Sequence, residues 1–371
     1  MDGIRSGADP GPSVDHEARR FHVRGVVQGV GFRPFVHRLA ERHDLAGWVR
    51  NESGEVFVQV EGRTRDLDSF CAALTQEIPP LARIDALDWE QIPAPRVCGF
   101  EVHASVATEA GRLPVSPDVA MCAPCRNELL DPENRRFGYP FITCTDCGPR
   151  YTVIETMPYD RVRTSMREFE QCPECLEEYR SPADRRFHSE TNSCPACGPS
   201  VWLSDAGGNQ LQQGNDAIAA AAVLLGTGGV LALRGLGGFH LAVDASDEEA
   251  VTRLRERKGR YEKPLAVMVE DLAAARRLAH LGEPELGLLT SRERPIVLAR
   301  RRPLAALAAS ISPGLDTVGI LLAYTPLHTL LLREAGRPLV LTSGTVSELP
   351  IAMALEVSRV CLGASAVGFL W

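Results

Sequence analysis

The chain has 371 residues, of which 44% are hydrophobic and 24% are charged, and its formal net charge is −8. These values are typical of a folded chain of two or three domains, and they exclude a mainly disordered chain, a fibrous repeat and a small disulfide-stapled scaffold. The negative balance provides no global basic field that would attract nucleic acid. The apolar run at residues 217–225 is far shorter than the ~20 residues of a membrane span, and residues 1–19 lack the apolar core of a secretory signal. We therefore expect no membrane contact, and we expect residues 1–19 to be a disordered leader.

Residues 20–106 alternate between the periodicities of strands and helices. Residues 21–27 alternate apolar and polar side chains like a strand, and residues 34–45 have helical spacing. Two short strands follow, then a second helix over residues 65–78 and later strands. The order is β-α-β-β-α-β with an additional edge segment, which predicts the ferredoxin-like split arrangement.

Eight of the 11 cysteines form C-x-x-C pairs within residues 118–200. The pairs recur with a period of 50 residues, and an Arg-Arg-Phe triplet and a Gly-Pro pair recur with them. Chance is a poor explanation of this match, so we interpret the region as a duplicated module. The first module holds Cys122, Cys125, Cys144 and Cys147, and the second holds Cys172, Cys175, Cys194 and Cys197.

Each module has the spacing C-x2-C-x18-C-x2-C. Two thiolates three residues apart fit one tight turn, and a second pair completes a tetrahedron of sulfurs, which is the ligand set of structural zinc. The sequence thus predicts two structural Zn²⁺ ions in a small zinc-ribbon-like double module. Pairing of cysteines across the modules is the open alternative, whereas a repeat of redox-active pairs is disfavoured. Metal-bound thiolates also favour a reducing, cytoplasmic location.

The segment Gln28-Gly29-Val30-Gly31-Phe32-Arg33 connects the first strand to the first helix. Glycines allow such a loop to turn its N–H groups inward, and the start of a helix adds positive potential for an anion. Arg33 adds a guanidinium fork that can bind two phosphoryl oxygens. For the loop alone, a tight strand–helix connection is the alternative interpretation.

Residues 27–62 closely resemble the acylphosphatase signature. In that family the loop arginine binds the phosphoryl group, and an asparagine of the next strand orients water. The resemblance implies that Arg33 and Asn51 are catalytic. An acyl phosphate is already activated, so positioning and charge stabilisation suffice without a covalent nucleophile. The phosphate would contact the loop residues Gln28, Gly29, Val30, Gly31 and Phe32.

Residues 212–355 are rich in Ala, Leu, Val and Gly and alternate strand and helix patterns, which predicts an α/β domain. A Gly-rich turn follows Arg234, clustered Lys and Arg residues occupy positions 257–263, and a hydroxyl-rich turn covers residues 342–347. A solvated helix end is the alternative interpretation of the basic cluster. Together the segments look like the YrdC-type adenylating domain, which implies ATP with Mg²⁺ as substrate. By position, the nucleotide would contact Arg234, Lys258, Arg260, Lys263, Ser343 and Thr345.

The order of the three parts closely resembles the N-terminal part of the HypF family, the carbamoyltransferases of [NiFe]-hydrogenase maturation. The resemblance implies an α+β multidomain fold with an acylphosphatase domain, a zinc module and an α/β YrdC-like domain. It also implies hydrolysis of carbamoyl phosphate and ATP-dependent formation of carbamoyl adenylate, for synthesis of the active-site cyanide ligands. A HypE-like maturation protein is the partner expected for the full-length family.

Two departures from the family pattern modify these expectations. The family turn usually reads Ser-x-Asn, whereas Thr345 stands at its third position, which bears on nucleotide affinity. We expect residues 356–371 to be a divergent apolar tail, and the sequence stops at Trp371, before the kinase-like transferase domain that the resemblance implies for the full-length family. We therefore expect a chain that cannot complete carbamoyl transfer, with acylphosphatase activity alone as the runner-up. A non-enzymatic zinc or RNA-binding module is the third interpretation, with weak RNA binding assigned to the YrdC-like domain.

Overall fold

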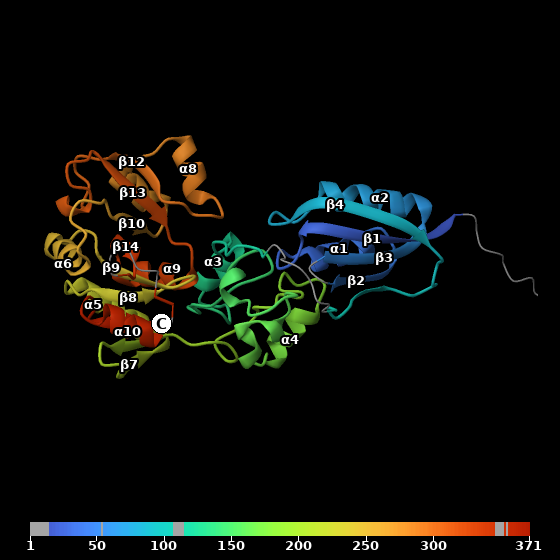
Figure 1. Ribbon diagram of the computed structural model, residues 1–371, viewed down its shortest axis with the longest axis horizontal. Helices are drawn as coiled ribbons and strands as arrows, with labels where there is room; N and C mark the ends of the chain where they lie inside the picture. The colour runs from blue at the N-terminus through green and yellow to red at the C-terminus, as the bar shows by residue number, and fades with distance from the viewer. Residues whose placement is uncertain (1–14, 53–54, 107–114, 346–351, 354) are drawn as a thin grey trace, which may run out of the picture. The chain divides into compact units, whose positions relative to one another are not determined.

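The computed structural model describes residues 15–52, 55–106, 115–345, 352–353 and 355–371 (Figure 1). Residues 1–14 of the expected leader and residues 346–347 of the hydroxyl-rich turn lie outside this part of the chain. The chain divides into two compact units, which are described separately. Unit 1 comprises residues 1–117, 153–168 and 173–191, and unit 2 comprises residues 118–152, 169–172 and 192–371.

Unit 1 contains a five-stranded sheet with strand order β4-β1-β3-β2-β5. β1 is antiparallel to β3 and β4, β2 is antiparallel to β3, and β5 is parallel to β2. The predicted β-α-β-β-α-β order is confirmed, with β5 as the edge strand. The elements are β1 (His16–Val26), α1 (Phe32–Arg42), β2 (Ala46–Glu52), β3 (Glu55–Arg63), α2 (Thr64–Gln76), β4 (Arg83–Ile92) and β5 (Phe100–Val102).

The first strand begins before residue 20, where the sequence placed the start of the domain. His16 already pairs with Arg63 of β3, and the side chain of Ala18 is buried. Further along β1, the buried Phe21 and Val23 belong to one cluster with side chains of α1 and α2. The rings of Phe21 and Phe70 of α2 meet edge to face, with their centroids 5.8 Å apart. This core fixes the end of β1 and the start of α1, and hence the loop between them.

The cysteine-rich region forms short helices joined by turns. α3 and α4 each begin directly after the first cysteine of a C-x-x-C pair, and a proline near each start presets the helical backbone. The duplication extends to the main chain, since the N–H groups of Phe137 and Phe187 donate to the carbonyls of Asn134 and Asp184, 50 positions apart. The elements are α3 (Ala123–Leu130), η1 (Tyr151–Val153), η2 (Arg161–Arg163), η3 (Ser165–Glu168) and α4 (Pro173–Arg180), where η denotes a 3₁₀ helix.

Unit 2 is built on a mixed ten-stranded sheet with the order β11-β12-β13-β10-β14-β9-β8-β15-β6-β7. Its elements are β6 (Trp202–Asp205), β7 (Gln210–Gln213), α5 (Gly214–Gly226), β8 (Leu231–Arg234), β9 (Phe239–Asp244), α6 (Glu248–Lys258), β10 (Ala266–Val269), α7 (Leu272–Leu278), β11 (Ala279–His280), α8 (Glu283–Thr290), β12 (Val297–Arg301), η4 (Ala309–Ile311), β13 (Thr317–Leu322), α9 (Pro326–Ala335), β14 (Leu339–Ser343), α10 (Leu355–Leu362) and β15 (Gly368–Leu370).

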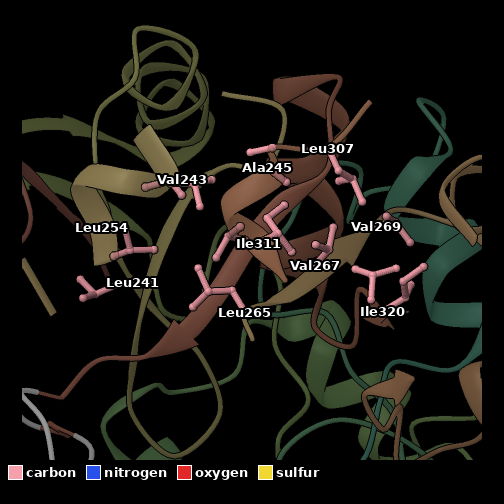
Figure 2. Close-up of a cluster of buried hydrophobic side chains, with 14 of the residues drawn as sticks. Leu241, Val243, Ala245, Leu254, Leu265, Val267, Val269, Leu307, Ile311 and Ile320 are labelled. Atoms are coloured by element: carbon pink, nitrogen blue, oxygen red, sulfur yellow. The ribbon is translucent and has the colours of Figure 1, made fainter. Parts of the chain in front are cut away.

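Strand alternation in unit 2 directs side chains to two packed faces of the sheet, one of which also carries a cavity. Val267 and Val269 of β10 and Ile320 of β13 lie in one buried cluster with Leu254 of α6 (Figure 2). Successive side chains of a strand point to opposite faces, so Met268 and its neighbours on the same face lie on the other side. The buried cluster therefore sets which strand residues are available to a ligand.

The C-terminal residues supply an internal strand of this sheet. β15 lies between β8 and β6, parallel to β8 and antiparallel to β6. Phe369 and Leu370 are fully buried, so the apolar residues that the sequence analysis set apart as a tail are core residues. Among the described residues, no helix has the length and apolar character needed to cross a membrane.

Candidate phosphate, nucleotide and zinc sites

The loop between β1 and α1 has the geometry expected of an anion-binding turn. Gly29 and Gly31 adopt φ values of 70° and 74°, in the left-handed region that favours glycine. Gly31 is the N-cap of α1, so the first N–H groups of the helix border the loop. The Val30 and Phe32 side chains are buried in the core of unit 1, which leaves their main-chain groups as the parts that can contact an anion.

Gln28 is held by contacts within unit 1 on three of its atoms. Its side-chain Nε2 donates to the carbonyl of Glu55 at 3.3 Å, and its Oε1 accepts from the N–H of Tyr159 at 3.3 Å. Its main-chain oxygen accepts from Ser116 Oγ at 2.7 Å. These bonds fix the loop, so the amide of Gln28 serves as a brace rather than as a free group.

Arg33 is buried and its guanidinium contacts four acceptors of unit 1. Nη1 donates to Asp160 Oδ1 at 3.0 Å and to Ser105 Oγ at 3.3 Å. Nη2 donates to Glu190 Oε1 at 2.9 Å and to the carbonyl of Tyr159 at 3.1 Å. Burial lowers the pKa of Arg33, but the two carboxylates more than compensate, so the pKa is raised above its ordinary value and Arg33 stays charged.

Asn51 has a buried amide whose hydrogen-bonding capacity is unused. Its exposed fraction is 1%, and within the described ranges neither Oδ1 nor Nδ2 has a hydrogen-bond partner. The main-chain oxygen of Asn51 accepts from the N–H of Val106, next to Ser105, which is a partner of Arg33. A buried amide without partners is costly, and a bound ligand or water would satisfy it.

Glu190 is the centre of a polar network that the sequence analysis missed. Besides Arg33, the N–H of Arg161 and the hydroxyl of Tyr179 donate to its carboxylate. Burial raises the pKa of Glu190, against the effect of these donors. Burial also raises the pKa of Tyr179, which keeps its proton, and lowers the pKa of His188 to about 4. Because Tyr179 gives its proton to Glu190, His188 Nδ1, 3.2 Å from the Tyr179 oxygen, must be the donor of that pair.

The eight predicted zinc ligands form two separate clusters, in the grouping that the repeat predicted. Within each cluster the sulfurs lie within 4.8 Å of one another. In the first cluster the Cys122–Cys144 and Cys144–Cys147 separations are 3.7 Å and the Cys125–Cys147 separation is 3.5 Å. Zn–S bonds of about 2.3 Å in a tetrahedron require sulfurs about 3.8 Å apart, so these residues fit Zn²⁺.

The second cluster has the same dimensions. Cys194 lies 3.7 Å, sulfur to sulfur, from both Cys172 and Cys197, and Cys175 completes the set. In the first cluster the N–H of Asp146 also donates to the Cys144 sulfur at 3.4 Å, as expected for a thiolate ligand. Closed sets of four sulfurs leave no coordination position for substrate, so the metal would serve the fold.

Four of the predicted nucleotide contacts meet at the end of β14. Lys258 Nζ donates to the carbonyl oxygens of Ser343 and Thr345, at 2.5 and 2.9 Å. Arg260 Nη1 donates to Thr342 Oγ1 at 3.2 Å. Burial and the charge of Arg260 lower the pKa of Lys258 to about 8. The two cations therefore lie beside the hydroxyl-rich turn, as the sequence motif requires.

The other two residues predicted to contact the nucleotide do not join the group at the end of β14. Arg234 is exposed at the end of β8, and Lys263 is exposed in the segment before β10. In the described part of the chain, no hydrogen bond joins either side chain to Lys258, Arg260 or Ser343. Their sequence position alone thus supports a role in binding.

A cavity of about 300 Å³ in unit 2 is lined mainly by strand residues that alternate with those of the cluster in Figure 2, together with Leu265 of that cluster. Its floor is apolar and is formed by alternate residues of β10, β13 and β14, including Met268, Leu321 and Leu341. Arg260 and Ser343 provide polar groups on its wall. An apolar floor with cations at the edge suits a nucleotide, whose base needs apolar contact and whose phosphates need charge.

Three further aromatic residues lie together here, two of them in the lining of the cavity. His240 and Tyr324 line it, and Tyr324 Oη lies 3.3 Å from His240 Nε2. The ring of His328 lies 4.6 Å from that of Tyr324, and among the described residues neither of its nitrogens has a partner. Burial lowers the pKa of His328 to about 3 and raises that of Tyr324 to about 12, so both are neutral at neutral pH.

Family models match most of the chain. The acylphosphatase model matches residues 19–102, and the model described as HypF finger matches residues 121–154 and 172–204. The model for Sua5, YciO and YrdC proteins, described as telomere recombination, matches residues 223–370. This last match extends through β15, and so it includes residues that the sequence analysis took as divergent.

Individual relatives are similar over most of the chain. Carbamoyltransferase HypF2 of Cupriavidus necator is 51% identical over 323 residues, which are 86% of this chain and 40% of the relative. Carbamoyltransferase HypF of Rhodobacter capsulatus is 45% identical over 361 residues, 95% of this chain and 46% of the relative. A crystal structure of full-length HypF in the phosphate- and nucleotide-bound form has a TM-score of 0.90 at 41% identity, covering 97% of this chain and 47% of that structure. The chain thus spans less than half the length of these three HypF relatives.

Proposed function

Because the chain belongs to the HypF family of carbamoyltransferases, we propose that it hydrolyses carbamoyl phosphate at Arg33 and Asn51 and uses ATP to convert the released carbamate into carbamoyl adenylate. The observation that carries the first half is the buried Asn51 amide, whose atoms lack hydrogen-bond partners among the described residues. The Asn51 main chain is bonded to Val106, which follows Ser105, a partner of Arg33. The second half is supported by the cavity, whose wall includes Arg260 and Ser343, and by Lys258, which donates to the carbonyl of Ser343.

In the first reaction, the oxygen of a water molecule attacks the phosphorus of carbamoyl phosphate. The bond from phosphorus to the carbamoyl oxygen breaks, carbamate leaves with the electron pair, and a phosphate oxygen takes the second water proton. Arg33 and the N–H groups at the start of α1 stabilise the charge on the phosphoryl oxygens. The Asn51 amide orients the water, which its unused hydrogen-bonding atoms allow.

In the second reaction, a carbamate oxygen attacks the α-phosphorus of ATP. The bond between the α-phosphorus and the bridging oxygen breaks, and pyrophosphate leaves with its electron pair. Lys258 and Arg260 neutralise the phosphates, and Mg²⁺ would share that charge. Ser343 contributes its hydroxyl at the same edge, while Arg234 and Lys263 are further candidates by sequence position only.

The two clusters of four cysteines would each hold a structural Zn²⁺ ion. The same family resemblance suggests a cytoplasmic chain, in which the thiolates stay reduced, and a HypE-like acceptor for the carbamoyl group in the full-length relatives. RNA binding is the less favoured alternative. Arg136 and Arg186, the conspicuous arginines of the repeat, are buried at 2% and 3% exposure and are not available to a nucleic acid.

The test is release of phosphate and of pyrophosphate by the purified chain, with carbamoyl phosphate and ATP supplied separately and together. We expect phosphate from carbamoyl phosphate alone, and pyrophosphate when both are present. Arg33→Ala and Asn51→Ala should each lower phosphate release at least ~100-fold. Arg42→Ala, which removes an exposed arginine of the same helix, is the matched control.

Two results would contradict the proposal. Phosphate release without pyrophosphate would restrict the activity to the acylphosphatase reaction, which is the second candidate. Release of neither product by a folded chain would reject the enzymatic proposal. Salt-dependent binding of RNA by such a chain would then favour the binding module.

A further inference from the structure

The guanidinium of Arg33 has no Nη hydrogen left for a substrate. Each Nη atom carries two hydrogens, and each donates to two acceptors of unit 1, which are Asp160 and Ser105 for Nη1 and Glu190 and Tyr159 for Nη2. A bidentate grip on a phosphoryl group needs two N–H groups on neighbouring nitrogens, at least one of them on Nη. Binding of phosphate by Arg33 therefore requires that one of the present acceptors leaves.

The two carboxylates that hold Arg33 differ in how firmly they are placed. The Glu190 side chain is 2% exposed and also accepts from Tyr179 and from the N–H of Arg161. The Asp160 side chain is 21% exposed, and besides Arg33 it accepts only from Ser105 Oγ, at 2.8 Å, among the described residues. Asp160 can turn toward solvent at the loss of two hydrogen bonds, whereas release of Glu190 would leave a buried carboxylate without its cation.

The duplicated module shows that the Glu190 network is specific to the second repeat. Tyr179, His188 and Glu190 correspond, 50 positions earlier, to residues that cannot form it, namely Leu129, Gly138 and Pro140. His188 has a φ of 50°, in the left-handed region where its counterpart Gly138 has 65°. A side chain other than glycine there costs roughly 1 kcal/mol, and the bond from His188 to Tyr179 offsets that strain.

We propose that Asp160 is a built-in competitor for the anion site of Arg33, displaced when a phosphoryl group binds, and that Glu190, braced by Tyr179, is the positioning residue that holds Arg33 in place throughout. This inference rests on the proposed role of Arg33 in binding phosphate. Asp160 lowers the affinity for substrate and for product phosphate together, and so it favours release of the product. Glu190 acts only through the orientation of Arg33.

The test is titration of inorganic phosphate into the full chain by calorimetry, together with kcat and KM for carbamoyl phosphate. We expect Asp160→Asn to tighten phosphate binding about tenfold and to lower KM similarly, with kcat changed little.

Glu190→Gln should lower kcat at least about tenfold with a smaller effect on KM, and Glu190→Asp should restore part of the loss. Tyr179→Phe tests the same network without removing a charge and should lower kcat to a lesser extent. Asp88→Asn removes an exposed carboxylate paired with Arg24 and is the matched control.

The outcomes separate the inference from the function it rests on. Unchanged or weaker phosphate binding by Asp160→Asn overturns the role of Asp160 as a competitor. Unchanged kcat in both Glu190→Gln and Tyr179→Phe overturns the positioning role, and Tyr179→Phe decides that point if Glu190→Gln does not fold. If Arg33→Ala binds phosphate as the unaltered chain does, the proposed phosphate site itself is wrong.

Discussion

The ammonium nitrogen of Lys258 lies 2.9 Å from the main-chain oxygen of Thr345, the third residue of the turn Ser343-Gly344-Thr345. The Thr345 hydroxyl is farther away, at 3.5 Å. Lys258 also donates to the main-chain oxygen of Ser343, so the backbone of the turn, more than its side chains, holds this cation. A change of residue type at position 345 therefore preserves the contact that places Lys258 beside the cavity.

This arrangement predicts that Thr345→Ala has a small effect on ATP binding and that Lys258→Ala has a large one. Hydrogen bonds to charged groups contribute about 1.5–3 kcal/mol, which corresponds to roughly ten- to hundredfold in affinity. We expect Lys258→Ala to raise the Kd for ATP within that range and Thr345→Ala to raise it less than about threefold, measured by calorimetry. Equal losses in the two variants would show that the side chain of Thr345 binds the nucleotide directly.

The pH dependence of ATP binding follows from the same lysine. Its pKa is lowered to about 8, so Lys258 is mostly charged at pH 7 and loses its proton as the pH rises through about 8. We expect ATP affinity to fall between pH 7.5 and about 9.5, in equilibrium titrations at constant ionic strength. Lys258→Arg should bind ATP with little change over this range, because arginine keeps its charge. The same decline in both proteins would assign the titration to another group.

Substitution of one zinc ligand tests the assignment of the cysteine clusters. Cys144 lies in a small buried core with Leu129, Tyr139 and Ile142, so this part of unit 2 depends on its metal. We expect Cys144→Ser to halve the zinc content measured by atomic emission and to lower Tm by at least about 5 °C, since a structural zinc ion contributes on the order of 10 kcal/mol in isolated fingers. Cys98→Ser, which changes an exposed cysteine outside both clusters, should leave both values unchanged. Full zinc content in Cys144→Ser would contradict the assignment of its ligands.

Local patterns were sufficient for much of the fold and for part of the site. Period-two strands and helical spacing predicted the β-α-β-β-α-β elements of unit 1. The cysteine spacing predicted the two clusters, because one ion imposes its geometry on a short stretch of chain. The loop glycines and Arg33 were likewise recognisable from adjacent residues. The main-chain contacts of Lys258 also agree with its predicted place beside the turn.

Contacts between distant residues left no comparable local pattern. Asp160 and Glu190 are 127 and 157 positions away from Arg33. The only signal for Glu190 was its departure from the first repeat, which has Pro140 at the equivalent position. The cavity floor was hidden for another reason, since residues such as Met268 are apolar strand residues whether they line a ligand site or a core. Arg234 and Lys263 were predicted near the nucleotide from their sequence positions alone, and both side chains are exposed.

The final prediction concerns the C-terminal strand, which the sequence analysis set apart as a divergent tail. Phe369 is fully buried between β8 and β6, and its ring centroid lies 6.4 Å from that of Phe239. Truncation of a buried phenylalanine costs about 3–5 kcal/mol, so Phe369→Ala should lower the free energy of unfolding by that amount in chemical denaturation. Leu304→Ala removes an apolar side chain that is 97% exposed and should change it by less than about 0.5 kcal/mol. Equal stability of the two variants would show that β15 is not part of the folded core. The cavity, whose floor belongs to the same sheet, would then form independently of these last residues.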